Sequence, residues 1–154
     1  MDSRKTEIHG KITQTTAMNY WIITVAQPHC DNILRGLKTM EIRRRIPMRM
    51  NLGDVIFIVR KGARGHIVGA CQVTYLTRGP VSYFCKVFLE KHRLSADELI
   101  EYAGDARFLV GLGLERLRLD TWCLTCQSFG FKRSPQWFYQ VSPEYQSTID
   151  RVLK

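Results

Sequence analysis

Hydrophobic positions in the first part of the chain occur in short blocks separated by proline and glycine. Residues 20–25 are rich in β-branched and aromatic side chains, which predicts a largely buried strand. Pro28 then starts a short helix over residues 29–35, with its apolar positions on one face. Gly36 follows where a helix C-cap needs a residue that can adopt positive φ, so we expect the chain to turn there.

A strand is expected directly after this turn. Thr39, Glu41 and Arg43 alternate with Met40 and Ile42, which is the period of a strand with one polar and one buried face. Because the turn brings Lys38 beside this polar face, its side chain should lie near those of Glu41 and Arg43. A cation beside a carboxylate on a basic ledge suits a polar or phosphate-bearing ligand. An exposed, ion-paired strand without a ligand is the alternative.

The next apolar blocks predict a meander of short strands. A tight turn at Gly53 and Asp54 leads into a strand over 55–59, and a turn at Gly62 and Gly65 leads into a strand over 66–76. Short strands with glycine corners are typical of a small barrel.

The second half alternates helical and strand patterns. We expect a helix over about 82–91, a helix over 95–103, a strand over 106–119 and a terminal helix over 143–153. Ser95 and Glu98 form a capping box at the start of the second of these helices. Gly111 and Gly113 share one face of the strand, which indicates close packing or a bend. The predicted fold class is therefore α+β, a small β-barrel flanked by helices.

Composition is that of one globular domain. The 154 residues are 45% hydrophobic and 24% charged, and no apolar run approaches the roughly 20 residues that a membrane span needs. Residues 1–19 are polar and lack the apolar centre of a secretory signal, so we interpret them as a flexible N-terminal extension to a domain over 20–154. A cytoplasmic protein without a membrane partner is expected.

Charge and cysteine content limit the classes of function to be expected. The net charge is +9, and residues 35–64 alone hold nine Lys or Arg against two acidic residues, hence +7. Such a concentrated basic segment predicts binding of nucleic acid or nucleotides, unless it only makes the surface soluble. The five cysteines are an odd number, which favours reduced thiols. Cys123 and Cys126 have the spacing of half a zinc site, but without a second pair we expect core cysteines, no metal and no cofactor.

The C-terminal part contains a proline turn between two cations and three consecutive aromatic residues. Alternation predicts that Trp137 and Tyr139 face one way and Phe138 the other, so at least one ring is in the core. Trp137 or Tyr139 is the candidate for stacking on a base beside Lys38, Glu41 and Arg43. The candidate phosphate contacts are Arg44, Arg45, Arg60, Lys61, Arg64, Lys132 and Arg133.

The segment 36–43 resembles the Gly-x-Lys-x-x-Glu-x-Arg signature of the ASCH domain family in the PUA-like superfamily. The strand followed by a Pro-initiated helix, the pair Gly53 and Asp54, and the tail 133–138 are also similar to that family. The resemblance covers roughly residues 20–141. It implies a small barrel flanked by helices, a cleft lined by the signature Lys, Glu and Arg, and RNA binding.

Some members of this family resemble enzymes. One is an amidohydrolase that removes the acetyl group from N4-acetylcytidine, and another is reported to cleave RNA. In the amidohydrolase branch the lysine is kept, but a threonine stands where this chain has Glu41. A further glutamate opens the helix after the hairpins, and here Glu90 is only an approximate match.

The sequence thus supports two main hypotheses and leaves open which is right. As a binding module for RNA, another nucleic acid or a modified nucleoside, Lys38 and Arg43 contact phosphate or a base edge, and Glu41 accepts from a base amino group. The outer arginines then supply only general affinity. As a hydrolase acting on RNA or N4-acylated cytidine, Lys38 and Glu41 serve as base and acid. A protein-interaction scaffold would do neither.

Overall fold

The computed structural model describes residues 4–8, 11–16, 18–120 and 123–153. Its strands outside the N-terminal segment are β3 (Tyr20–Val25), β4 (Met40–Arg43), β5 (Val55–Arg60), β6 (Ile67–Pro80), β7 (Phe108–Leu117) and β8 (Tyr139–Gln140). The helices are α1 (His29–Leu34), α2 (Val81–Phe84), α3 (Leu89–His92), α4 (Ala96–Ala103) and α5 (Gln146–Val152), with 3-10 turns η1 (Cys126–Phe129) and η2 (Pro143–Tyr145). The α+β class is confirmed.

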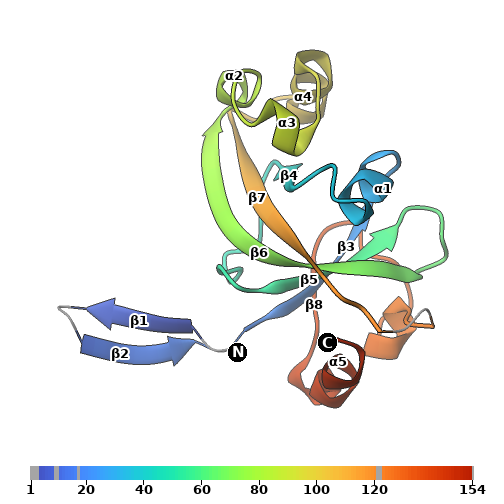
Figure 1. Cartoon of the computed structure of the whole chain (residues 1–154). Helices are drawn as coiled ribbons and strands as arrows, with labels where there is room; N and C mark the ends of the chain where they lie inside the picture. The colour runs from blue at the N-terminus through green and yellow to red at the C-terminus, as the bar shows by residue number, and fades with distance from the viewer. Residues whose placement is uncertain (1–3, 9–10, 17, 121–122, 154) are drawn as a thin grey trace.

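The six strands form one mixed sheet in the order β4-β7-β6-β5-β3-β8 (Figure 1). Within the described residues the two outer strands do not pair with each other, so the expected closed barrel is not confirmed. β3 and β5 are parallel, with Ile22 opposite Phe57, whereas the other neighbours are antiparallel. The meander prediction missed this parallel pair, because a parallel neighbour needs a crossover and α1 with β4 lies on it.

The N-terminal segment contains a separate hairpin. β1 (Arg4–Ile8) and β2 (Lys11–Thr16) pair antiparallel in a two-stranded sheet of their own. Part of the predicted flexible extension over residues 1–19 falls outside the described residues.

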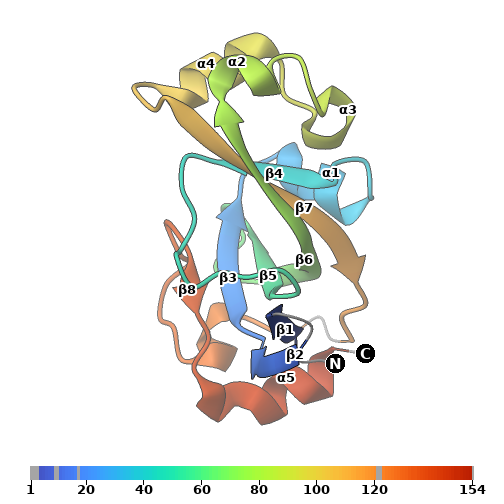
Figure 2. The same cartoon turned by 90° about the vertical axis from the view of Figure 1, so that its left-hand side faces the viewer.

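Helices cover the two ends of the twisted sheet (Figures 1 and 2). At one end, α2, α3 and α4 pack on β4 and the start of β7 through a cluster around Phe84 and Leu99. At the other end, α5 and η1 pack on β3 and β5 through Phe57 and Phe129, whose ring centroids are 5.1 Å apart. Burying these apolar side chains is the main stabilising term of the fold. Among the described helices, none is long and apolar enough to cross a lipid bilayer.

The predicted helix over 82–91 is wrong, because the structure has two short helices in its place. The chain reverses at Phe88, which has a φ of 62°, between α2 and α3. Phe88 packs against the rings of Tyr75 and Tyr83, at centroid distances of 6.3 and 6.0 Å. A three-to-four-residue apolar spacing fits two separate turns as well as one helix, so the pattern could not detect the break.

The other local predictions are largely confirmed. Gly36 has a φ of 78°, as a C-cap requires. Ser95 and Glu98 form the expected capping box on α4. β6 begins near the expected residue but runs on to Pro80, pairing with β7 along that length.

Gly111 and Gly113 lie at the close approach that the sequence indicated. A Cβ atom at position 113 would come within 2.1 Å of the Tyr75 ring, and one at 111 would come within 2.8 Å of the Met40 sulfur. Gly113 is opposite Met40 and Gly111 is opposite Ile42 in the β4–β7 pair, so the missing side chains leave room over β7 for the Tyr75 ring and the Met40 side chain.

Cys30, Cys71, Cys85 and Cys126 are free thiols. Cys30, Cys71 and Cys126 are buried, as expected for core residues, and burial raises the pKa of Cys71 to about 12. Cys123 is exposed, so the core prediction is wrong for this residue. Cys123 lies in the loop before η1, whereas Cys126, the first residue of η1, belongs to a core cluster.

Candidate functional site

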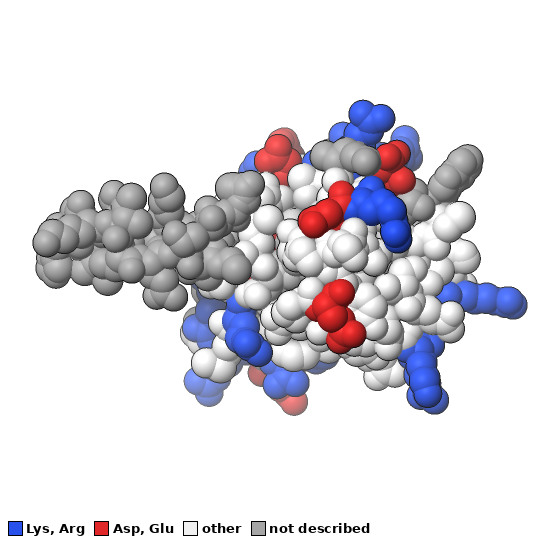
Figure 3. Space-filling view, turned by 90° about the horizontal axis from the view of Figure 1, so that it is seen from below, with Lys and Arg blue, Asp and Glu red and all other residues white. Residues whose placement is uncertain are grey.

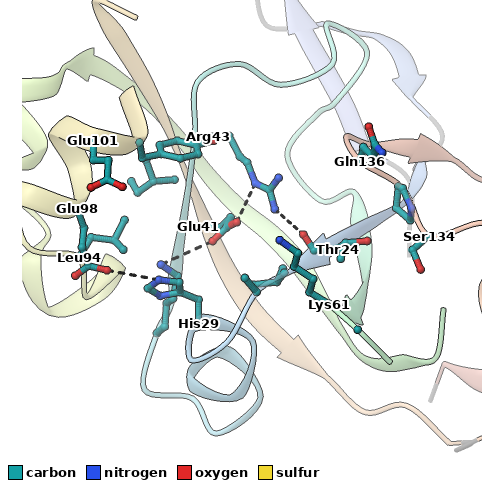
Figure 4. A pocket seen from close by; sticks show the side chains of 17 residues that line it. Thr24, His29, Glu41, Arg43, Lys61, Leu94, Glu98, Glu101, Ser134 and Gln136 are labelled. Atoms are coloured by element: carbon teal, nitrogen blue, oxygen red, sulfur yellow. Dashed lines mark hydrogen bonds and ion pairs between the residues drawn. The ribbon is translucent and has the colours of Figure 1, made fainter. Parts of the chain in front are cut away.

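A cavity of about 900 Å³ opens between the sheet and the helices. Its wall is formed by the end of β3, the start of α1, β4 with the preceding Lys38, α4, and the loops around Lys61 and Ser134. Glu41, Arg43 and Thr24 lie between α4 on one side and Ser134 with Gln136 on the other (Figure 4). Segments far apart in the sequence therefore converge on β4.

The centre of the site is a chain of ionic contacts through Glu41. Arg43 donates from Nε to Glu41 Oε2 at 2.8 Å and from Nη2 to the Thr24 carbonyl at 3.2 Å. Lys38 Nζ lies 3.7 Å from Glu41 Oε1 and donates to the His92 carbonyl at 2.6 Å. The expected alternation is found: the side chains of Lys38, Glu41 and Arg43 meet at one cavity.

The site is far more buried than an ion-paired surface strand would be. Lys38 is 2% exposed and Glu41 is 7% exposed. α3 covers the start of β4, because Thr39 donates its backbone N–H to the Lys91 carbonyl and Lys38 bonds to the next carbonyl along. The alternative of an exposed ion-paired strand is therefore wrong. The alternation of residues along β4 could not reveal this burial, because the helix that covers the strand comes from a distant part of the sequence.

His92 is the structural support for Lys38. Its buried ring accepts at Nδ1 from the Leu94 backbone N–H at 3.0 Å, which leaves Nε2 to donate to the Phe84 carbonyl at 2.9 Å. The ring thereby ties α2 to α3 and holds in place the carbonyl that Lys38 contacts. The lysine ammonium is thus positioned by backbone rather than by a flexible partner.

Burial lowers the pKa of Lys38, although the charge of Glu41 opposes this shift. The folded protein then loses this proton at a lower pH than the unfolded chain, whose lysine pKa is about 10.4. Between these two pKa values unfolding takes up a proton, so stability gained through this group increases with pH.

We therefore predict a pH-dependent difference between the native protein and Lys38→Met. The free energy of unfolding of the native protein, relative to that of the variant, should rise as the pH increases towards about 10.4, the ordinary pKa of lysine, because only the native protein has this titration. Urea denaturation at several pH values measures the difference. Lys86→Met removes an exposed lysine and is the control, measured at the same pH values. Parallel curves for Lys38→Met would contradict the expectation.

His29 and Glu98 add a second pair of titratable groups. His29 Nε2 lies 3.7 Å from Glu98 Oε2, and burial followed by the charge of Lys38 lowers the pKa of His29. A backbone hydrogen bond from Ser95 lowers the pKa of Glu98. At neutral pH the cavity therefore presents the neutral imidazole of His29 beside the ionised carboxylate of Glu98.

Two polar atoms of cavity-lining residues are buried without a hydrogen-bond partner in the described structure. They are Thr24 Oγ1 and His29 Nδ1. Buried polar groups are nearly always satisfied, and leaving one unpaired costs about 1–3 kcal/mol.

Most of the other site residues that the sequence predicted do not line this cavity. Phe138 is the core ring of the aromatic tail, whereas Trp137 is 44% exposed and lies outside the cavity lining, with the Arg45 guanidinium 5.7 Å from its ring centroid. Lys61 lines the cavity, and Arg60 pairs with Asp31 at 2.8 Å. The other predicted phosphate contacts, Arg44, Arg45, Arg64, Lys132 and Arg133, are exposed side chains outside this lining.

The carboxylates that α4 brings to the cavity were missed by sequence reasoning. Glu98 and Glu101 line it, together with Tyr102 and Ser134, whereas Glu90 on α3 does not. The capping box had located the start of α4, and a side chain three or four residues further along shares a face with Glu98. That spacing was the available signal for Glu101 and Tyr102.

Basic side chains are not gathered equally on all faces. On the face at the α5 end, Lys and Arg stand singly around the rim with acidic residues among them (Figure 3).

No protein-family model matches the chain, and no curated protein resembles it in sequence. Solved structures do resemble it. The ASCH protein of Zymomonas mobilis superposes with a TM-score of 0.74 at 18% identity, covering 88% of this chain and 96% of that one. A serine-to-alanine variant of that protein gives 0.73 at 19% identity, with 86% and 96% covered. A tyrosine-to-phenylalanine variant gives 0.73 at 18% identity, with 88% and 99% covered.

Proposed function

Because the chain has the fold of ASCH domain proteins, we propose that its cavity binds a nucleotide of RNA or of another nucleic acid, or a modified nucleoside. Lys38, Glu41 and Arg43 select the ligand. The observation that carries this proposal is the cluster of buried Lys38 and Glu41 with partly buried Arg43 on the wall of a large cavity. Burying such charges gives little or no stability in return, so a ligand is the better reason for keeping them.

The dimensions and chemistry of the cavity support this ligand class. A volume of about 900 Å³ is within the usual range of small-molecule sites. Glu41 Oε1 lies beyond hydrogen-bond distance of Lys38, so it keeps the capacity to accept from a base amino group. Arg43 and Lys61 supply positive charge for a phosphate at the same wall. We therefore expect a base with an exocyclic amino group, such as cytosine, to be preferred.

Calorimetric titration with cytidine 5′-monophosphate and uridine 5′-monophosphate tests the proposal. The cytidine nucleotide should bind more tightly, and Lys38→Met should weaken both. If neither nucleotide nor any oligonucleotide binds at low salt, nucleotide binding is excluded.

A hydrolase is the second candidate, favoured by the lowered pKa of Lys38 next to carboxylates. A desolvated lysine amine is a better base at neutral pH than an exposed one. In this function Lys38 removes a proton from a water or hydroxyl group, and Glu41 donates one to the leaving group. Incubating the protein with N4-acetylcytidine and with RNA, and following product formation by chromatography, separates this function from simple binding. Turnover that disappears in Lys38→Met would establish it.

The outer cations predict a steep salt dependence of nucleic-acid binding. The relevant side chains are Lys61, Arg64, Lys132 and Arg133, which are all exposed. If three or four of them contact phosphates of a single strand, the logarithm of the affinity should fall with the logarithm of salt concentration with a slope of roughly −2 to −3.

Fluorescence anisotropy with a labelled oligocytidylate of about ten nucleotides, measured between about 50 and 200 mM salt, gives this slope. The double replacement of Lys132 and Arg133 by Ala should make the slope less steep by up to about 1.4. An affinity that is independent of salt would exclude binding through phosphates.

A further inference from the structure

We propose that a second cavity next to the first binds the neighbouring nucleotide of the same strand, so that the preferred ligand is a single-stranded nucleic acid of two or more nucleotides. This inference rests on the proposed function of the first cavity. The second cavity has a volume of about 440 Å³, and Arg44, Arg45 and Arg78 are among its lining residues.

The charge of the second cavity is entirely positive. Its lining contains three arginines and no carboxylate. In the described part of the chain, none of these arginines forms an ion pair with an acidic side chain. Elsewhere the fold does neutralise an arginine, because Arg60 is paired with Asp31 at 2.8 Å. The three guanidinium groups therefore keep donors for an anionic ligand.

Aromatic rings hold these guanidinium groups in place. Each arginine lies over a different ring, with guanidinium carbon to centroid distances of 5.4 Å for Arg44 over Tyr102, 5.7 Å for Arg45 over Trp137 and 4.5 Å for Arg78 over Phe108. Such stacking uses the face of the guanidinium and leaves N–H groups at its edge for a phosphate. Ordering the side chains beforehand also reduces the entropy that binding must remove.

Exposed apolar side chains accompany the arginines. Met48, which lines the second cavity, is 101% exposed. Trp137 and Phe108, whose rings lie against Arg45 and Arg78, are 44% and 42% exposed. Met50 and Val110 are buried at its floor. Flat rings and soft apolar side chains next to cations favour stacked bases, whereas an acidic peptide would use the cations alone. This combination favours nucleic acid as the occupant.

The two cavities share a wall. Tyr102 lines the first cavity, and the Arg44 guanidinium that lies over its ring lines the second. The Arg44 backbone N–H also donates to Tyr102 Oη at 3.3 Å. Arg43 faces the first cavity and Arg45 the second, so consecutive residues at the end of β4 reach both. A strand with one nucleotide in the first cavity could place the next across this wall.

The test compares an oligonucleotide with a mononucleotide. The probes are labelled oligocytidylate of about ten nucleotides, as RNA and as DNA, and cytidine 5′-monophosphate. Arg78→Ala and Arg45→Ala should each lower the affinity for the oligonucleotide by about tenfold and change the affinity for the mononucleotide by less than about twofold. Arg151→Ala is the charge-matched control, because Arg151 is exposed on α5 at the opposite end of the molecule (Figure 1). It should change neither affinity by more than about twofold.

Three results would overturn the second site. The first is an effect of Arg78→Ala on oligonucleotide affinity that is no larger than that of Arg151→Ala, and the second is an equal loss of affinity for mononucleotide and oligonucleotide. The third is that a polyglutamate peptide competes for binding as strongly as unlabelled oligonucleotide does. If these replacements act as expected but Glu41→Gln leaves oligonucleotide binding unchanged, the second site stands and the proposed role of the first fails. If the native protein does not bind the oligonucleotide, both fail.

Discussion

Replacing Glu41 with Gln is expected to weaken binding of cytidine 5′-monophosphate by about 1.5–3 kcal/mol, or roughly 10- to 150-fold. The amide keeps the size of the side chain but loses its charge. It can no longer make a charge-assisted hydrogen bond to a base amino group, and it leaves the buried Lys38 without its only described carboxylate contact. Arg43 loses its 2.8 Å carboxylate partner as well.

The uridine nucleotide provides the contrast in this experiment, because it lacks the amino group. Its affinity should change less, so the preference for cytidine should shrink in the variant. Calorimetry gives both affinities, and Glu115→Gln is the matched control, since Glu115 is exposed on β7 outside the first cavity. An unchanged preference in Glu41→Gln would remove Glu41 from ligand selection.

Replacing Phe84 with Ala is expected to lower the free energy of unfolding by about 3–5 kcal/mol. Phe84 is fully buried between α2 and α4, where Leu99 and Ala103 belong to the same cluster, and its ring contacts those of Tyr83 and His92. Removing the ring leaves a cavity that these short helices can fill only in part.

Loss of Phe84 should also reach the candidate site. α4 brings Glu98, Glu101 and Tyr102 to the first cavity, and its attachment to the sheet depends on this cluster. We expect limited proteolysis to cut the 81–103 segment faster than the rest of the described core, because local unfolding follows local packing. Phe108→Ala, at an exposed ring, should cost less than about 1 kcal/mol in urea denaturation. Equal losses for the two replacements would contradict the importance of this cluster.

Contacts within a few residues explain which predictions held for the fold. The capping box at Ser95 and the positive φ at Gly36 depend on neighbours close in sequence, and both were recognised. The break at Phe88 depends on Tyr75, more than ten residues earlier, so periodicity alone could not place it. The open order of the sheet depends in the same way on distant pairings such as that of β3 with β5.

The same distinction between local and distant contacts applies to the candidate site. By itself, the sequence determined the Lys38, Glu41 and Arg43 cluster, since one turn and one strand set their spacing and common face. Only the tertiary structure decided that α3 buries this cluster, that α4 adds two carboxylates, and that Arg44 stands between two cavities. The physical reason is that strand alternation fixes the direction of a side chain, whereas burial and partners come from segments that are brought together only when the whole chain folds.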